Sequence, residues 1–243
     1  MPLKAASDSM PIPSTPSTPA PAEAAPWMTI APGEAREDLL KTRLMQAGIP
    51  KYLRSKTLKG FYAHTKSLQE ILKAANEYVE YFCAHKGEQV DGVALRGPVG
   101  CGKTHIAIAI LREVIARGFS GLYCNVPEFL KDIRATYDAN TGPDESSLIE
   151  YTREVDLLIL DDLGVENRIL DPVRDRGKWL CDRMYLVING RLEADRPIIM
   201  TTNCSLDELE QQFDKRIVSR LYEMTRRKFP PFPDTDYRKA HMK

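Results

Sequence analysis

Apolar residues follow two alternating patterns along the chain. Short apolar runs, typical of buried strands, occur in "GVALR", "GLYCNV", "DLLIL" and "PIIMTT". Between these runs, apolar residues recur every three to four positions, as in "KTHIAIAILREVIAR", which predicts helices with one buried face. Capping boxes at Ser67–Glu70 and Ser205–Glu208 predict two of the helix starts. Because alternating strands and helices form parallel sheets covered on both faces, we expect an α/β fold.

The N-terminal part of the chain differs from the rest. Residues 1–33 are rich in Pro, Ala, Ser and Thr, and such a segment buries too little apolar surface to offset its ordering entropy. We expect these residues to form a disordered tail. Residues 34–60, here called the lead-in segment, begin with a short amphipathic helix that ends near Gly48 and Pro50. This helix could dock on the domain or on a partner. Residues 61–243 carry the alternating pattern and are expected to form one domain.

Bulk composition excludes few functions. The 243 residues include 34 basic and 34 acidic side chains, so the net charge indicates no partner. The five cysteines are scattered, without a C-x-x-C pair, which favours reduced thiols and argues against a zinc site. No apolar run is long enough to cross a bilayer, and the N-terminus lacks a signal pattern. These features predict a soluble, cytoplasmic protein without membrane contact.

The stretch "GPVGCGKTH", residues 97–105, carries the strongest chemical signal. It fits the P-loop pattern G-x-x-x-x-G-K-[ST] and lies between an apolar strand and an apolar helix. Glycines let backbone amides turn inward at the helix N-terminus, where the helix dipole favours anions. Lys103 should reach the β- and γ-phosphates, and Thr104 should place its hydroxyl on Mg²⁺. The residues expected to hold the nucleotide are Gly97, Pro98, Val99, Gly100, Cys101, Gly102, Lys103, Thr104 and His105.

Two other strand ends supply the polar groups that a P-loop site needs. Asp161 and Asp162 follow the apolar run "LLIL". We expect Asp161 to bind Mg²⁺ and Asp162 to orient the attacking water. Asn203 ends the strand "PIIMTTN" and is expected to touch the γ-phosphate and the water, with a simple turn residue as the alternative. This combination favours an ATPase of the additional-strand class over a small-molecule kinase.

The stretch "DKRIVSRL" places two cations on one face of a predicted helix. Arg216 and Arg220 are four residues apart. Such a pair is most often a solvated surface. In a ring or filament of ATPases, the same arrangement can project an arginine into the active site of a neighbour.

Together the motifs resemble those of the DnaC/DnaI-type replicative helicase loaders, a branch of the AAA+ ATPases. The resemblance runs from about Gly48 to the C-terminus. It rests on "AGIPKYLRSKTLKGF", "GPVGCGKTH", "VDLLILDDLG", "PIIMTTN", "KRIVSRL" and "DTDYRK". We therefore expect a P-loop NTPase fold of the AAA+ (ASCE) class, with a parallel five-stranded sheet flanked by helices, over residues 61–243.

The resemblance implies a role for each matching residue. Lys103 and Thr104 match the Walker A residues, and Asp161 matches the metal-binding acid of Walker B. Asp162 stands where many AAA+ proteins have a longer Glu. Asn203 matches the sensor 1 position, which places it among the catalytic residues with Lys103 and Asp162.

The resemblance also implies contacts outside the P-loop. Arg220 matches the arginine finger that acts in trans, and Arg238 matches a sensor 2-like arginine at the nucleotide. Tyr137 lies where an aromatic residue of the loaders contacts single-stranded DNA. Lys131 and Arg134 flank it and could meet phosphates. The four-residue spacing of apolar positions before Tyr137 leaves open that it only extends the buried face of its helix.

As a loader, the protein would hydrolyse ATP with Mg²⁺. Its partners would be a DnaB-like replicative helicase, single-stranded DNA and further copies of itself in a spiral or ring. Two alternatives stay open: an IstB-like transposition ATPase that acts with a transposase, and an adaptor that binds ATP without hydrolysing it. The chain departs from several loaders at its N-terminus, where a Pro/Ala-rich tail and one helix replace a folded helicase-binding domain.

Overall fold

A computed structural model of the protein describes residues 34–85, 88–137, 144–164 and 176–237. The chain divides into two compact units, Met1–Glu37 and Asp38–Lys243. The tail expected for residues 1–33 lies outside the described residues. The elements in chain order are α1 (Glu34–Gln46), α2 (Lys66–Ala84), β1 (Val93–Arg96), α3 (Lys103–Ala116), β2 (Gly121–Asn125), α4 (Val126–Ala135), α5 (Glu145–Glu154), β3 (Leu157–Leu163), α6 (Arg176–Glu193), β4 (Ile198–Thr202), α7 (Leu206–Gln212) and α8 (Lys215–Met224).

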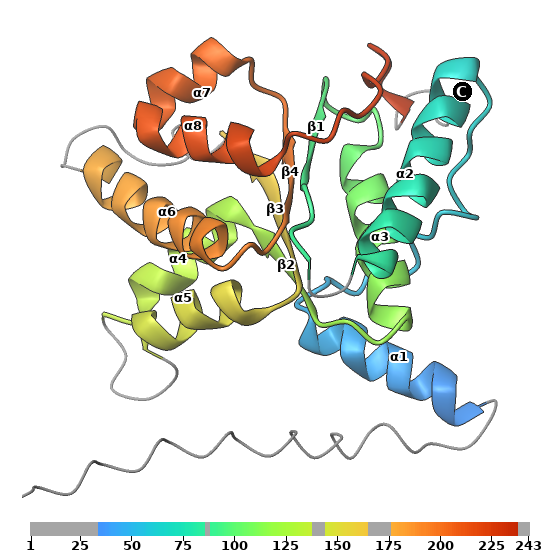
Figure 1. Ribbon diagram of the computed structural model, residues 1–243, viewed down its shortest axis with the longest axis horizontal. Coiled ribbons are helices and arrows are strands. Elements are labelled where there is room, and N and C mark those ends of the chain that lie inside the picture. Colours follow the sequence, from blue (N-terminus) through green and yellow to red (C-terminus); the bar gives the residue numbers. More distant parts are fainter. Residues whose placement is uncertain (1–33, 86–87, 138–143, 165–175, 238–243) are drawn as a thin grey trace, which may run out of the picture. The chain divides into compact units, whose positions relative to one another are not determined.

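The described strands form one parallel sheet in the order β1-β4-β3-β2 (Figure 1). The expectation of five strands was wrong for the described residues, which form four. Beside β1, Arg227 makes only a single parallel bridge to Val93. Prolines follow at 230, 231 and 233, and proline lacks the amide that a strand ladder needs. The chain therefore passes the sheet edge without adding a strand.

Successive side chains of a strand point to opposite faces of the sheet, so the core has two layers, one on each face. In β3, Leu157 and Ile159 pack with the residues of α2 and α3. Leu158 and Leu160 pack with the residues of α4, α6 and α8. Figure 1 shows α2 and α3 on one side of the sheet and α4, α5 and α6 on the other. The α/β fold with a doubly covered parallel sheet is therefore confirmed.

The helix N-termini show where a local sequence pattern is enough to predict the start of a helix. The capping box at Ser205–Glu208 is present as predicted and opens α7. The box predicted at Ser67–Glu70 was wrong, because α2 starts two residues earlier and Thr65 caps it by accepting a hydrogen bond from the amide of Leu68. Helix α5 was not predicted. Its N-cap Asp144 accepts a hydrogen bond from the amide of Ser147.

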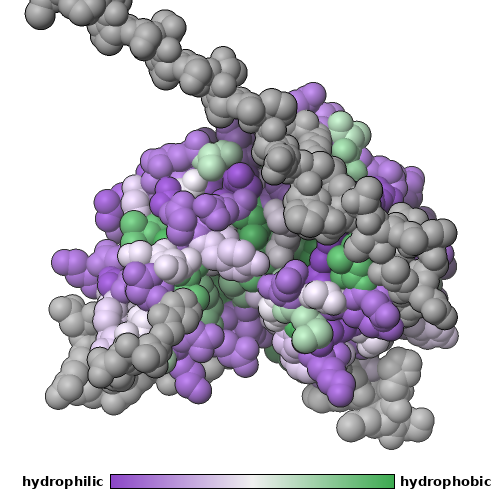
Figure 2. All heavy atoms as spheres, turned by 90° about the horizontal axis from the view of Figure 1, so that it is seen from below, coloured by the Kyte–Doolittle hydropathy of each residue, from purple (hydrophilic) through white to green (hydrophobic). Residues whose placement is uncertain are grey.

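The described surface is largely polar. On the face shown in Figure 2, hydrophilic residues cover most of the area and small apolar areas lie between them. Among the described residues, no helix combines the length and the apolar character that a membrane crossing requires.

Candidate functional site

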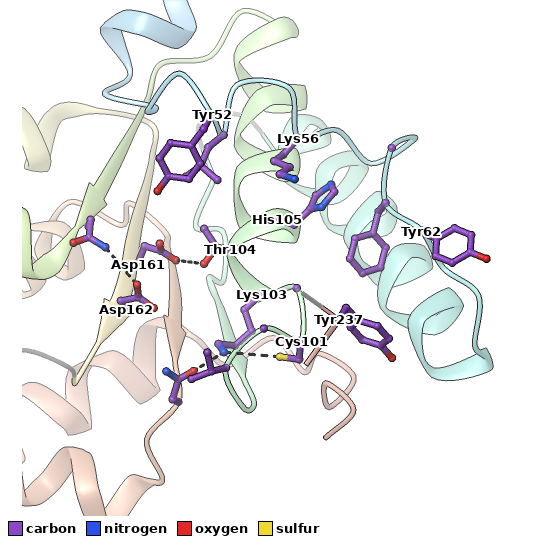
Figure 3. Close-up of a pocket in the computed structure, with 18 of the residues that line it drawn as sticks. Tyr52, Lys56, Tyr62, Cys101, Lys103, Thr104, His105, Asp161, Asp162 and Tyr237 are labelled. Atoms are coloured by element: carbon purple, nitrogen blue, oxygen red, sulfur yellow. Dashed lines mark hydrogen bonds between the residues drawn. The ribbon is translucent and has the colours of Figure 1, made fainter. Parts of the chain in front are cut away.

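A cavity of about 720 Å³ lies at the carboxyl ends of the strands, beside the N-terminus of α3 (Figure 3). Five of the side chains predicted for the site line it together: Lys103, Thr104, Asp161, Asp162 and Asn203. They come from the P-loop and from the ends of β3 and β4. Parallel strands deliver their C-terminal residues to one edge of the sheet, which is why residues 100 positions apart meet here.

Lys103 is buried within its own loop. Its ammonium donates hydrogen bonds to Asn203 Oδ1 at 2.5 Å and to the carbonyls of Pro98 at 2.7 Å and Gly97 at 2.9 Å. Burial lowers the pKa of Lys103 below its ordinary value. The P-loop therefore holds one buried cation at a helix N-terminus and links it directly to the tip of β4.

Asp161 is 2% exposed and accepts hydrogen bonds from three hydroxyl groups. Thr104 and Thr201 donate to Oδ1 at 2.9 and 2.7 Å. Tyr123, on the neighbouring strand β2, donates to Oδ2 at 2.7 Å. A buried carboxylate needs such donors to offset its desolvation. Tyr123 and Thr201 were not found by sequence reasoning, because no local motif marks a residue that contacts the site from a neighbouring strand.

Asp162 has a different environment from its neighbour. Its φ of 59° lies in the left-handed region, which is uncommon for a residue with a Cβ. Its amide donates to the Thr201 hydroxyl at 3.0 Å, and Asn125 at the end of β2 donates to its carboxylate at 3.5 Å. The carboxylates of Asp161 and Asp162 therefore have different hydrogen-bond donors, and Asn125 joins the site as a further residue that the sequence did not reveal.

The donor set fits Mg²⁺ in the presence of phosphate. The described residues hold no group of three or more His, Cys, Asp or Glu that could bind a metal alone. Mg²⁺ in phosphoryl-transfer sites is usually held by one or two carboxylates together with phosphate oxygens and waters. Thr104 and Asp161, one hydroxyl and one carboxylate 2.9 Å apart, supply the protein part of such a set.

The other side of the cavity is formed by residues that precede the P-loop in the sequence. Tyr52 and Lys56 of the lead-in segment line it, together with Phe61 and Tyr62. The Phe61 ring meets the His105 ring edge-on at 5.2 Å. Burial lowers the pKa of His105, and its Nε2 lies 3.0 Å from the carbonyl of Thr57, so Nε2 carries the hydrogen. The lead-in segment, predicted only as a docking element, is therefore also a wall of this cavity.

The C-terminal part of the described chain closes the P-loop from outside. Gly100 has a φ of 78°, and a Cβ there would lie 1.9 Å from Asp236 Oδ1. The amide of Tyr237 donates to the Gly100 carbonyl at 3.2 Å. Tyr237 also lines the cavity. Arg238, predicted at the nucleotide, lies outside the described residues, although its described neighbour Tyr237 is at the site.

Arg220 does not line this cavity. Its guanidinium lies 4.9 Å from the centre of the Tyr185 ring, and its Nε donates to Asn189 Oδ1 at 2.8 Å. Arg216 lies 5.8 Å from the same ring centre. Both arginines thus extend from α8 towards α6, and Arg220 does not reach the P-loop of its own chain.

A second aromatic residue of α6 also holds two arginines. Arg134 of α4 and Arg183 lie 4.8 and 5.1 Å from the centre of the Trp179 ring. Tyr137 is 55% exposed, so it does not extend the buried face of α4, and its hydroxyl accepts a 2.7 Å hydrogen bond from Arg183. Lys131 is exposed on α4. Arg134, Arg183, Arg216 and Arg220, which lie on the rings of Trp179 and Tyr185, together form an arginine array.

Comparisons with known proteins identify the family and the fold of this chain. Residues 64–222 match the model of a protein family described as IstB-like ATP binding protein. The replicative helicase loader DnaC of Escherichia coli K12 is 24% identical over 188 residues, which cover 77% of this chain and 71% of that protein. The crystal structure of the DnaC helicase loader aligns with a TM-score of 0.61 at 22% identity, over 76% of this chain and 100% of that one. The crystal structure of DnaI aligns with a TM-score of 0.58 at 22% identity, over 73% and 92% of the two chains.

The chain belongs to the IstB-like ATP binding protein family, since the family profile covers well over half of its residues. The similarity to the DnaC/DnaI-type loaders inferred from the motifs is confirmed. The structural likenesses show that the fold is the AAA+ P-loop fold.

Proposed function

We propose that this member of the IstB-like ATP binding protein family is a Mg²⁺-dependent ATPase that loads or remodels a DnaB-like replicative helicase on single-stranded DNA. One observation carries the ATPase part: the buried Lys103 ammonium and the Thr104–Asp161 pair meet at the carboxyl edge of the sheet. The helicase part is supported by the similarity to DnaC over 77% of this chain.

Each polar residue of the cavity has a role in this proposal. Lys103 exchanges the loop carbonyls for β- and γ-phosphate oxygens when ATP binds, because a charged acceptor binds an ammonium more strongly than a neutral carbonyl does. Thr104 and Asp161 hold Mg²⁺, which neutralises charge on the phosphates when it is bound. Asn203, already bonded to Lys103, contacts the γ-phosphate. Asp162, contacted by Asn125, orients the attacking water.

The nucleotide base occupies the opposite side of the cavity. Phe61, Tyr62 and His105 offer aromatic surface there, and stacking on such rings stabilises a base. Tyr52 and Lys56 of the lead-in segment line the same side of the cavity. A bound nucleotide would therefore contact both the lead-in segment and the P-loop.

Arg220 acts on the nucleotide of a neighbouring copy. Within its own chain it is held by Asn189 and Tyr185, outside the cavity. An arginine that stabilises charge on the transferred phosphoryl group in trans makes turnover depend on assembly. This is the basis for the proposed spiral or ring of copies.

Single-stranded DNA would contact the surface around Tyr137. Arg134 and Arg183 lie against the nearby Trp179 ring. Arg183 also donates to the Tyr137 hydroxyl and pairs with Glu145, so phosphate would have to replace Glu145 at that guanidinium. Lys131 adds a further cation on α4. Aromatic rings beside phosphate-binding cations are the combination that binds single strands without sequence preference.

Co-purification with the replicative helicase tests the proposed function. Tagged protein is mixed with a DnaB-type helicase and, in parallel, with a transposase, each with and without ATP and Mg²⁺. We expect ATP-dependent capture of the helicase, and Lys103→Ala is the matched control that should lose the ATP dependence. Capture of the transposase alone would favour the transposition ATPase, which the family profile over residues 64–222 keeps as the second candidate.

Turnover separates the ATPase from a non-hydrolysing adaptor. The φ of 59° at Asp162 and its short side chain are the features that favour the adaptor. Phosphate release is measured with and without single-stranded DNA. The adaptor would be favoured if the protein binds ATP tightly but, with DNA present, releases no more phosphate than Lys103→Ala does.

A further inference from the structure

Tyr123 connects two parts of the chain through different groups. It lies in β2, at the edge of the sheet, and its side chain is 7% exposed. Its hydroxyl donates to Asp161 Oδ2 at 2.7 Å. Its amide donates to the carbonyl of Ala47, next after the end of α1, at 2.8 Å. One residue thus contacts both the carboxylate of the proposed Mg²⁺ site and the lead-in segment.

The contact with the lead-in segment is close. Gly48 has a φ of 70°, and a Cβ there would lie 3.1 Å from the Tyr123 carbonyl oxygen. Leu44, Ala47 and Ile49 are each at most 2% exposed, so the turn is packed into the core around β2. A shift of this turn must therefore move the backbone of Tyr123, since buried groups in close contact move together.

The hydrogen bonds of Asp161 differ in origin. Thr104 belongs to α3 and Thr201 to β4, and both donate to Oδ1. Tyr123 donates to Oδ2 from the strand that the lead-in segment touches. Burial and the nearby Asp161 raise the pKa of Tyr123 well above its ordinary value, so its hydroxyl stays protonated and remains a donor.

We propose that Tyr123 is a positioning residue that couples the end of α1 to the Mg²⁺ site. The position of the turn at Ala47–Gly48 determines how firmly Asp161 is held, and Mg²⁺–nucleotide binding in return stabilises that turn. This inference rests on the proposed nucleotide site and adds a route by which a ligand of the lead-in segment changes metal binding.

The first test removes only the hydroxyl. Binding of a fluorescent ATP analogue is titrated against Mg²⁺ for the wild type and for Tyr123→Phe. We expect the Mg²⁺ concentration at half-maximal effect to rise about tenfold in Tyr123→Phe, the lower end of what loss of an outer-shell partner costs in metal affinity. Binding in EDTA should stay unchanged. Tyr151→Phe is the matched control, because its hydroxyl contacts the Gln46 carbonyl at 3.5 Å without touching Asp161.

The outcomes separate the two proposals. Equal Mg²⁺ midpoints in wild type and Tyr123→Phe would overturn the coupling and leave the nucleotide site standing. Wild-type protein that binds no nucleotide, or binds it without regard to Mg²⁺, would overturn the proposed function itself.

A second test needs no variant. Hydrogen exchange of peptides covering residues 44–49 and 121–125 is measured in wild type with nucleotide, in Mg²⁺ and in EDTA. We expect Mg²⁺ to slow exchange of both peptides, because the Tyr123 amide is bonded to Ala47. Slowing confined to the P-loop peptide would contradict the coupling. Where Tyr123→Phe is folded, it should lose the slowing at residues 44–49.

Discussion

The nucleotide cavity and the arginine array hold their charged groups by different means. In the cavity, Lys103 and Asp161 are at most 5% exposed and are bound by carbonyls, an amide oxygen and hydroxyls. In the array, guanidinium groups lie on the rings of Trp179 and Tyr185, and two of them also pair with carboxylates, Arg183 with Glu145 and Arg216 with Asp214. The Arg216 side chain is 72% exposed. Removing one partner of a buried charge has a large cost in free energy, because the charge is left without a hydrogen bond. Exposed cation–π contacts contribute only about 0.5–1 kcal/mol each.

The two arrangements suit two kinds of ligand. A phosphate and a metal require fixed positions, and buried hydrogen bonds fix them. A strand of DNA or a neighbouring subunit arrives and leaves, and cations on aromatic rings can adjust to it. Substitutions in the cavity should therefore remove nucleotide binding, whereas substitutions in the array should leave it intact and change turnover or DNA binding.

Lys103→Ala should produce the largest effect. The variant removes the cation that two or more phosphate oxygens would bind, and charge-assisted bonds are worth about 1.5–3 kcal/mol each. We expect affinity for a fluorescent ATP analogue to fall roughly 100-fold or more. Thermal melting without nucleotide checks that the fold is kept. ATP affinity within a factor of two of wild type would contradict the phosphate role of Lys103.

Arg220→Ala should keep ATP binding and lose turnover. An arginine finger typically contributes on the order of 10³-fold or more to the rate. DNA-stimulated phosphate release is the measurement. Mixing Arg220→Ala with Lys103→Ala sharpens the test, because the second variant can supply Arg220 to a nucleotide held by the first. Normal turnover of Arg220→Ala alone would refute a site shared between copies.

Trp179→Ala should weaken binding to single-stranded DNA by degrees. It removes the ring beside Arg134 and Arg183, but Arg183 stays paired with Glu145, so we expect the loss of one cation–π contact, roughly 2- to 5-fold. Fluorescence anisotropy across a salt series also reports the phosphate contacts, since each one contributes about 0.7 to the salt slope for single strands. Lys178→Ala removes an exposed neighbouring charge on α6 and is the control. Unchanged affinity in Trp179→Ala would remove this surface from the DNA site.

The smallest effect should come from the pH dependence of His105. Burial lowers its pKa in the folded state, so the folded protein favours the neutral ring. Its contribution to stability is therefore present above the ordinary His pKa of about 6.5 and is lost as the pH falls below it. The stability difference between wild type and His105→Gln, from urea melts at pH 8 and pH 5.5, should shrink at the lower pH. A stability difference between wild type and His105→Gln that grows at pH 5.5 would contradict the lowered pKa of His105.

Sequence reasoning was strongest where one local pattern carries the chemistry. The P-loop spacing placed Lys103 and Thr104, and the polar residues after two apolar runs placed Asp161 and Asn203, all of which line one cavity. It was weaker for elements without such a pattern. Helix α5 was missed, and five strands were expected where the described residues form four.

Periodicity and adjacent residues were enough to predict the parallel sheet covered on both faces and the phosphate-binding turn. Only packing shows that Tyr123 bonds to Asp161, that the lead-in segment lines the cavity and that Arg220 lies on Tyr185. These contacts join residues 30 or more positions apart. Their existence depends on how helices and strands pack, which no local pattern encodes.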